Sequence, residues 1–338
     1  MAGNEHPSVL VTGGAGYVGA HCCKAFAAAG WKVVAYDNLS RGHADAVRWG
    51  PLIHGDILDA PTLDKALDEV RPDLVAHFAA FAYVEESVRQ PDLYYRNNSL
   101  GSLTLLDRMR AAGLSKLIFS STCATYGVPR VVPIDENHPQ SPINPYGWSK
   151  LFVERMLADH AVAYGLDSVA LRYFNAAGCD SDGLIGECHD PETHVIPLAI
   201  EGALDGERPF TVFGTDFDTR DGSAVRDYIH VEDLARAHVL AGEWIAGNKG
   251  FHAFNLGTGK GTTVFEIAHA VAAACGSDRA IKTGPRRAGD PPILIADPTK
   301  ALRELGWKAE RSDIDTIVRT ALAWHRRTRR SANPPQPL

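Results

Sequence analysis

Several signals that mark special classes of protein are missing from this sequence. Its six cysteines form no Cys-x-x-Cys pair and no regular spacing, which argues against a disulfide framework and indicates no metal site. No apolar run approaches the length of a membrane span, and the first run, residues 8–12, is too short for a signal peptide. Lysine and arginine total 34 against 41 acidic residues, a net charge of −7 that argues against a nucleic-acid-binding face. We therefore expect a cytoplasmic protein that binds neither membranes nor nucleic acid.

What the sequence does contain is 338 residues, 45% of them apolar, which is enough to bury a core without disulfides. In the first half, longer helical patterns separate short β-branched runs at residues 9–11, 32–36, 74–78, 116–119 and 169–171. This alternation predicts an α/β fold with a Rossmann-type, doubly wound parallel sheet. Ligands of such sheets bind at the carboxyl ends of the strands, so site residues are expected directly after each strand.

After about residue 175 the pattern loosens, and clusters of Gly, Asp and Pro separate shorter helical stretches. We predict a nucleotide-binding domain over residues 1–175 and a smaller mixed α/β substrate-binding domain mostly over 176–330. The segment 226–257 is expected to return to the first domain, because its pattern contains a helix and a strand that could extend the sheet. From Arg326 onward the chain is rich in arginine and then in proline, which cannot propagate a helix, so a flexible tail is predicted, with 331–338 outside both domains.

Three glycines, Gly13, Gly16 and Gly19, lie between the first predicted strand and a helical run that ends before Gly30. In this position the first glycine permits a tight turn, the second lets the backbone approach a pyrophosphate, and the third lets helix and strand pack closely. The helix N-terminus offers unpaired N–H groups and the positive end of its dipole to phosphates. The spacing alone could be a structural turn, but its place between strand and helix indicates dinucleotide binding.

Two acidic residues follow the next strands. Asp37 ends the second one, where a carboxylate would accept hydrogen bonds from both hydroxyls of an adenosine ribose and would repel a 2′-phosphate. The sequence therefore predicts NAD, rather than NADP, as the cofactor. Asp56 follows the third strand and could reach the adenine, but a helix-capping role is an equally good interpretation of this residue.

Tyr146 and Lys150 stand four residues apart after Pro145, a good first residue of a helix, so they fall on one helix face. A phenol with an ordinary pKa of about 10 is a poor base, but a neighbouring ammonium and a positive nicotinamide ring would favour the phenolate. Lys150 could also hold the nicotinamide ribose. Thr122 ends a strand and would bring a hydroxyl to the substrate oxygen that loses its proton. Tyr/Lys pairs are common by chance, but together with the glycines these residues form a candidate catalytic group.

These motifs, with several later ones, make the chain resemble the UDP-glucose 4-epimerase (UDP-galactose 4-epimerase) family of the extended short-chain dehydrogenase/reductase superfamily. The resemblance runs nearly end to end and is carried by residues 11–19, 37–38, 55–57, 77–79, 120–122, 146–150, 171–175, 225–231, 255–257 and 285–290. It implies reversible, NAD-dependent epimerisation at C4 of UDP-glucose and UDP-galactose through a 4-keto sugar. It also implies a homodimer built from helices near 91–113 and 146–164.

The resemblance implies further ligand contacts. In the NAD site, Gly13, Gly16, Gly19, Asp37, Asp56, Tyr146 and Lys150 would be joined by Tyr17, Val18, Asn38, Ile57, Phe78, Ala79, Ala80, Asn97 and Tyr173. In the UDP-sugar site, the phosphates would be held by Asn175, Arg226 and Arg287. Phe213 would line the uracil, Asp290 would bind the uridine ribose, and the sugar would lie near Thr122, Tyr146, His194 and Leu294. Arginine suits phosphate oxygens and a carboxylate suits vicinal hydroxyls, although without the family each arginine would be read as a surface ion-pair partner.

A few positions depart from the commonest family pattern. Thr122 stands where many members have Ser, which keeps the hydroxyl. Tyr83, after Ala82, replaces a lysine that is often near the cofactor, and His194 replaces an amide that faces the sugar nucleotide. Leu294 occupies a position that is Tyr in some members and small in others. These departures leave the range of sugars open, including UDP-N-acetylglucosamine and UDP-pentoses.

Two other functions are weaker alternatives. A nucleotide-sugar 4,6-dehydratase needs an acid and a base beside the strand-end Thr122, and Cys123 and Ala124 cannot supply them. A non-catalytic dinucleotide sensor would have no reason to keep Thr122, Tyr146 and Lys150 together.

Overall fold

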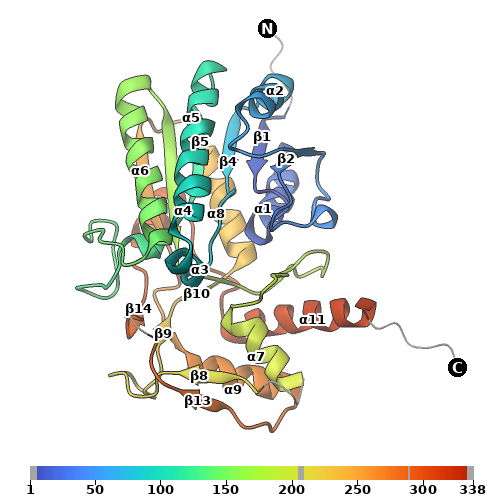
Figure 1. The fold of residues 1–338 in the computed structure, drawn as a ribbon, viewed down its shortest axis with the longest axis vertical. Helices are drawn as coiled ribbons and strands as arrows, with labels where there is room; N and C mark the ends of the chain where they lie inside the picture. Colours follow the sequence, from blue (N-terminus) through green and yellow to red (C-terminus); the bar gives the residue numbers. More distant parts are fainter. Residues whose placement is uncertain (1–5, 205–208, 288–289, 333–338) are drawn as a thin grey trace, which may run out of the picture.

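The computed structural model describes residues 6–204, 209–287 and 290–332. Within these ranges the larger domain is built on a seven-stranded sheet whose neighbouring strands all run parallel (Figure 1). The spatial order of its strands is β11 (Phe251–Leu256), β6 (Asp167–Tyr173), β5 (Lys116–Thr122), β4 (Leu74–His77), β1 (Ser8–Thr12), β2 (Lys32–Asp37) and β3 (Leu52–His54). The predicted Rossmann-type, doubly wound fold is confirmed.

Helices cover both faces of this sheet. One apolar core lies under α1 (Tyr17–Ala28), α8 (Val231–Trp244) and α10 (Thr299–Leu305). The core on the opposite face lies under α2 (Ala60–Val70), α5 (Gly101–Ala111) and α6 (Pro145–Tyr164). Every residue of β1 is buried. Because both faces of the sheet are covered, the sequences of the central strands are continuous apolar runs and do not alternate between apolar and polar residues.

The strand order reverses beside β1, which pairs with β2 on one side and with β4 on the other. Loops that leave β1 and β4 therefore separate at this point, and in doubly wound sheets ligands bind in the resulting crevice at the carboxyl ends of the strands. Gly13 follows β1, and Thr122 and Tyr173 are the last residues of β5 and β6. The sheet thus brings the predicted site residues to one edge.

The smaller domain has a core of its own between three helices, α7 (Val195–Leu204), α9 (Val264–Cys275) and α11 (Ile314–Ala332) (Figure 1). Short strands join it to the first domain. They pair as β7 (Asn175–Ala177) with β10 (Tyr228–His230), β8 (Thr211–Phe213) with β13 (Lys282–Gly284), and β9 (Val225–Arg226) with both β12 (Thr262–Thr263) and β14 (Ile293–Leu294). Although α8 and β11 come late in the sequence, α8 packs on the large sheet and β11 is one of its strands. The domain boundaries drawn from the sequence stay a prediction.

Short helical elements connect the rest. They are η1 (Ala44–Ala46), α3 (Val84–Arg89), α4 (Pro91–Tyr94), the π-helical turn η2 (Tyr95–Leu100) and η3 (Cys123–Thr125). The elements α4, η2 and α5 follow one another without a break, so the helix expected near 91–113 is one run with a π turn in its middle. Such turns are frequent at functional sites.

The structure corrects the prediction for the end of the chain. Helix α11 continues to Ala332, so the arginine-rich stretch that begins at Arg326 is helical and not frayed. Arginine is a good helix former, and only the Asn-Pro-Pro sequence after Ala332 is incompatible with a helix. Residues 333–338 of the predicted tail lie outside the described residues.

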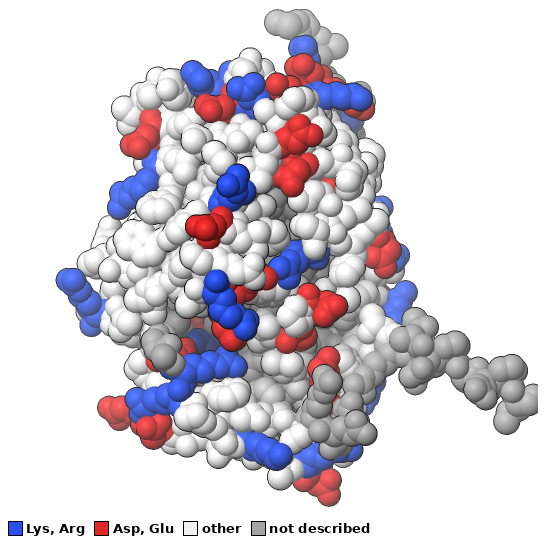
Figure 2. Space-filling view, in the orientation of Figure 1, with Lys and Arg blue, Asp and Glu red and all other residues white. Residues whose placement is uncertain are grey.

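Two surface features bear on partners. Over the described ranges, no helix combines the length and the apolar character that crossing a membrane requires. On the face seen in Figure 2, blue Lys and Arg groups lie beside red Asp and Glu groups over both domains, so charges of the two signs are mixed there.

Candidate active site

The loop after β1 forms a cradle that side chains would fill. Gly13 has a φ of +74°, and a Cβ there would lie 2.6 Å from the backbone nitrogen of Ala79. A Cβ on Gly19 would lie 2.1 Å from the carbonyl oxygen of Gly13, so only glycine lets α1 approach the loop this closely. At Gly16 the nearest atom would be 3.3 Å away, and this residue begins α1 without a side-chain cap. Open backbone N–H groups at a helix N-terminus fit a pyrophosphate, as expected for NAD.

Asp37 supports this loop from the end of β2. Its Oδ2 accepts a hydrogen bond from the Ala15 amide at 3.0 Å, and its Oδ1 accepts one from the Leu39 amide at 2.8 Å. Asp56 accepts hydrogen bonds from the Asn38 side chain at 2.9 Å and from the Leu58 amide at 2.8 Å. Asp59, and not Asp56, caps α2, so the capping interpretation of Asp56 is wrong.

The first turn of α6 sets the position of Tyr146. Asn144 caps the helix by accepting a hydrogen bond from the Gly147 amide at 2.8 Å, and Pro145 occupies the first turn. A Cβ on Gly147 would lie 2.6 Å from the carbonyl oxygen of Ala124, so glycine allows α6 to pack against the turn that follows β5. Tyr146 is thereby held near Thr122, the last residue of β5.

The ionisation of Tyr146 differs from the sequence-based argument. Burial raises the pKa of Tyr146 well above its usual value, and the nearby Thr122 side chain opposes this only in part. Lys150 lies one turn further along α6 and is buried too, which lowers its pKa to about 7. Its Nζ donates to the carbonyl oxygen of Ser120 at 2.9 Å and lies 4.8 Å above the ring of Phe119. The protein alone therefore keeps Tyr146 as a phenol.

A buried ion pair that the sequence analysis missed fixes this part of the site. Arg172 on β6 donates to Glu154 on α6 at 2.6 Å, and both side chains are almost fully buried. Glu154 also accepts hydrogen bonds from Ser121 at 2.5 Å and from Gln140 at 3.0 Å. Since Glu154 lies one helical turn after Lys150, the pair holds the Lys150 end of α6 against β5 and β6.

The remaining residues expected around NAD surround the same strand ends. Tyr173 shares a hydrogen bond with Ser120 at 2.7 Å, and Tyr17 donates to the carbonyl oxygen of Gly178 at 2.5 Å. Asn97 lies in the π-helical turn and donates to Asn98 at 3.0 Å. The other members are placed by their elements: Val18 in α1, Ile57 after β3 and against α5, and Phe78, Ala79 and Ala80 directly after β4.

The residues expected to hold UDP gather on β7, β9, β14 and the nearby loops. Asn175 begins β7, and Leu294 on β14 is in register with Arg226 on β9. Arg226 forms an ion pair with Asp290, and the Arg287 guanidinium lies 4.6 Å above the ring of Phe213. The Arg287 cation, which is expected to meet phosphate, thus lies over a ring that could stack on a base. Ala288 and Gly289, part of the quoted 285–290 motif, lie outside the described residues.

Leu294 and His194 have different surroundings. Leu294 packs against a small apolar cluster that contains Phe174. Cys123, the residue after Thr122 in the chain, packs against the same cluster. His194 is in contact with acidic side chains, its Nδ1 lying 2.8 Å from Glu192 Oε1, and its ring is 6.3 Å from that of Tyr83. The Arg41 guanidinium lies over the Tyr83 ring, 5.2 Å from its centre.

The fold, the cradle and the Thr/Tyr/Lys group together define a Rossmann-type, dinucleotide-dependent enzyme. Comparison with known proteins specifies it further: the chain belongs to the NAD dependent epimerase/dehydratase family, whose model matches residues 9–257. It is 50% identical to a UDP-glucose 4-epimerase of Rhizobium meliloti, over 96% of this chain and 98% of that protein. The resemblance inferred from the motifs is confirmed.

Solved structures agree. A UDP-glucose 4-epimerase from Brucella ovis, in complex with NAD, is 53% identical, has a TM-score of 0.91 and covers 94% of this chain and 97% of its own. One from Stenotrophomonas maltophila, with bound NAD and formylated UDP-arabinopyranose, is 38% identical, with a TM-score of 0.93 and coverage of 96% and 100%.

Proposed function

We propose that the protein interconverts UDP-glucose and UDP-galactose by NAD-dependent epimerisation at C4. The observation that carries this proposal is the grouping of Tyr146, Thr122 and Lys150 at the same sheet edge as the glycine cradle after β1. Relatives over nearly the whole chain that are named UDP-glucose 4-epimerase support the choice of substrate.

In this mechanism Tyr146, as the phenolate, takes the proton of the sugar 4-hydroxyl and becomes a phenol, and Thr122 holds that hydroxyl in place. Bound NAD supplies a nicotinamide that accepts and returns the hydride, and its positive ring lowers the cost of the phenolate that burial opposes. Lys150 would hold the nicotinamide ribose. A correctly placed base of this kind contributes about 10² to 10⁴ in rate.

Binding energy remote from C4 lets both faces of the sugar react. Arg226 and Arg287 would hold the diphosphate, and the 4-keto sugar would rotate about its phosphate linkage before hydride returns to the opposite face. Asp290, which is paired with Arg226, would receive the uridine ribose.

The surroundings of Thr122 also make nucleotide-sugar dehydration a weaker candidate for the function of this protein. Burial raises the pKa of the Cys123 thiol to about 12, so this neighbour of Thr122 has no accessible thiolate at neutral pH. Ala124 has no ionisable group.

We also propose a cytoplasmic homodimer. Support for the dimer comes from exposed apolar side chains on neighbouring turns, Leu100 on η2 and Trp148 and Phe152 on α6, with the last two rings 5.8 Å apart. The unpaired state of the six cysteines supports a reducing compartment. Light scattering would detect the dimer, and Phe152→Glu should shift it toward the monomer.

The enzymatic proposal is tested with purified protein, UDP-galactose and no added NAD. We expect UDP-glucose to form, and denatured protein to release NAD and not NADP. Tyr146→Phe, which keeps the ring but lacks the proton acceptor, is the matched control. Absence of UDP-glucose from NAD-containing protein would reject the proposed reaction.

A further inference from the structure

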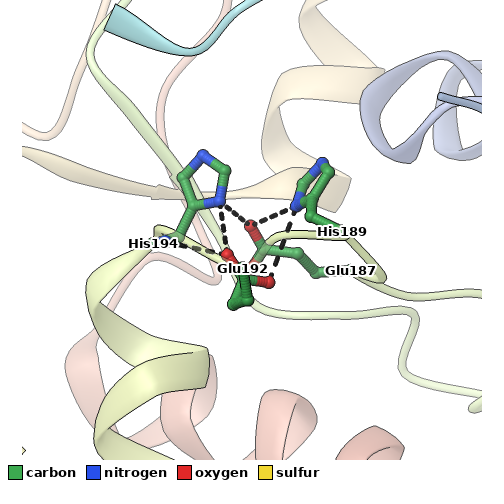
Figure 3. Close-up of side chains that lie close together, drawn as sticks. All are labelled: Glu187, His189, Glu192 and His194. Carbon is green, nitrogen blue, oxygen red and sulfur yellow. Dashed lines mark hydrogen bonds and ion pairs between the residues drawn. The ribbon is translucent and has the colours of Figure 1, made fainter. Parts of the chain in front are cut away.

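Four side chains outside the Thr/Tyr/Lys group converge in the segment that leads into α7. Glu187, His189, Glu192 and His194 turn one ligand-type atom each toward a common point, and these atoms all lie within 4.8 Å of one another (Figure 3). All four residues are partly buried. Two imidazole nitrogens and two carboxylate oxygens form a donor set that divalent transition metals accept.

The distances within the group are close to those between ligand atoms around a small cation. His194 Nδ1 lies 2.8 Å from Glu192 Oε1 and 3.0 Å from Glu187 Oε1. His189 Nδ1 lies 3.4 Å from Glu187 Oε1 and 3.7 Å from Glu192 Oε2. A zinc ion at about 2.0–2.2 Å from each ligand atom would place neighbouring ligands about 3.4 Å apart. Small side-chain movements would therefore accommodate the ion.

Two buried atoms of the group make ion-pair contacts inside it but no hydrogen bond. Among the described residues, Glu187 Oε1 and His189 Nδ1 are buried without a hydrogen-bond partner, and the Glu187 side chain is only 5% exposed. Buried polar atoms without a hydrogen bond are rare in native proteins. Both atoms are aimed at the centre of the group, where a cation would satisfy them together.

We propose that Glu187, His189, Glu192 and His194 bind one Zn²⁺ ion per chain. Mg²⁺ and Ca²⁺ prefer oxygen ligands alone, whereas zinc accepts imidazole and carboxylate in one four-coordinate site. The protein fills all four positions, which is typical of a structural and not a catalytic zinc site. The proposal does not depend on the proposed function.

The ion would fix a loop that bridges the two domains. The His189 ring lies 6.0 Å from that of Tyr17 and 5.9 Å from that of Tyr83, and both tyrosines belong to the first domain. A metal held between His189 and His194 would thus tie the start of α7 to the wall beside the NAD cradle. In this arrangement His194 is a metal ligand through Nδ1.

The test uses the full chain, stripped of metal with a chelator and then titrated with Zn²⁺ against a chromophoric competitor. We expect one zinc per chain in the parent protein. Glu187→Gln, which keeps the size of the side chain, should weaken zinc binding about 100-fold or more, since even changes to groups behind metal ligands cost about 10- to 100-fold. His269→Ala removes an exposed histidine on α9 and is the matched control, with unchanged affinity expected.

Two further measurements separate a built site from adventitious binding. Co²⁺ in place of zinc should give the intense visible absorption of a tetrahedral complex, and zinc should raise the melting temperature of the parent but not of Glu187→Gln. Circular dichroism and NAD content establish that the variant is folded. Zinc affinity equal in the parent and in a His189→Ala/His194→Ala variant, or displacement of zinc by equimolar Mg²⁺, would overturn the proposal.

Discussion

Replacing Lys150 with methionine should make the protein more stable near neutral pH while it removes a residue of the candidate catalytic group. The Lys150 side chain is 3% exposed, and burial lowers its pKa from 10.5 to about 7. Between these two values the unfolded chain binds a proton that the folded chain does not. The free energy of unfolding therefore rises with pH through this window and falls as the pH drops toward 7, below which the whole penalty of the buried charge is present.

The size of the effect follows from the shift. Each unit of pKa corresponds to about 1.4 kcal/mol, so the full penalty below pH 7 is of the order of 5 kcal/mol. Between about pH 6.5 and about pH 8.5 the Lys150 contribution to the free energy of unfolding should rise by about 2 kcal/mol. Methionine has a similar length and no charge, so the variant should lack this rise.

Urea denaturation of nucleotide-free protein at the two pH values measures this, because NAD would add a pH dependence of its own. The quantity of interest is the difference in pH dependence between parent and Lys150→Met, since other titrating groups cancel in it. Lys65→Met changes an exposed lysine on α2 and should leave the pH dependence as it is in the parent. Parallel stability curves for the parent and Lys150→Met would refute the assignment of a buried, neutral Lys150.

Three further predictions concern turnover and binding. Tyr146→Phe should lower kcat by about 10² to 10⁴ with UDP binding nearly unchanged, as measured by steady-state kinetics and calorimetry. If kcat were retained, Tyr146 would not be the base. Arg287→Ala should weaken UDP binding by about 1.5–3 kcal/mol. The guanidinium of Arg286 already pairs with Asp216, so Arg286→Ala should leave UDP binding unchanged. Equal losses of affinity in the two variants would show that Arg287 is an ordinary surface cation. Leu294→Cys should raise kcat/KM for UDP-N-acetylglucosamine relative to UDP-glucose by at most about 1–3 kcal/mol, and a parent that already uses both sugars equally would show that Leu294 is no gate.

The parts of the fold that could be predicted are those fixed by local chemistry. A strand buried on both faces needs a continuous apolar run, and the runs in the first half of the sequence correspond to β1, β2, β4, β5 and β6. Gly13 and Gly19 were recognisable because a positive φ and a close helix contact leave no other residue type there. Tyr146 and Lys150 fall together because a helix places residues four apart on one face.

What could not be predicted depends on contacts between segments that are distant in sequence. Glu154 and Arg172 read as ordinary surface charges until α6 is packed on β6, and only then do they become a buried pair. The same packing buries Lys150 and Tyr146, which is why the proximity of an ammonium did not lead to a phenolate. Sequence spacing gives the shared face of a helix, but the dielectric around that face comes from the tertiary structure.

The Glu187 to His194 group illustrates why the proposed metal site could not be predicted from the sequence. In a strand, Glu187 and His189 would point to one side and Glu192 and His194 to the other, because successive side chains alternate. In a helix, Glu187 and His194 would share one face while His189 and Glu192 lay on the opposite one, at about 100° per residue. Neither regular structure brings the four ligand atoms together, yet they lie within 4.8 Å because this segment belongs to no helix or strand. Convergence here is a property of one irregular backbone path, so a search for cysteine motifs or periodic ligands in the sequence could not reveal it.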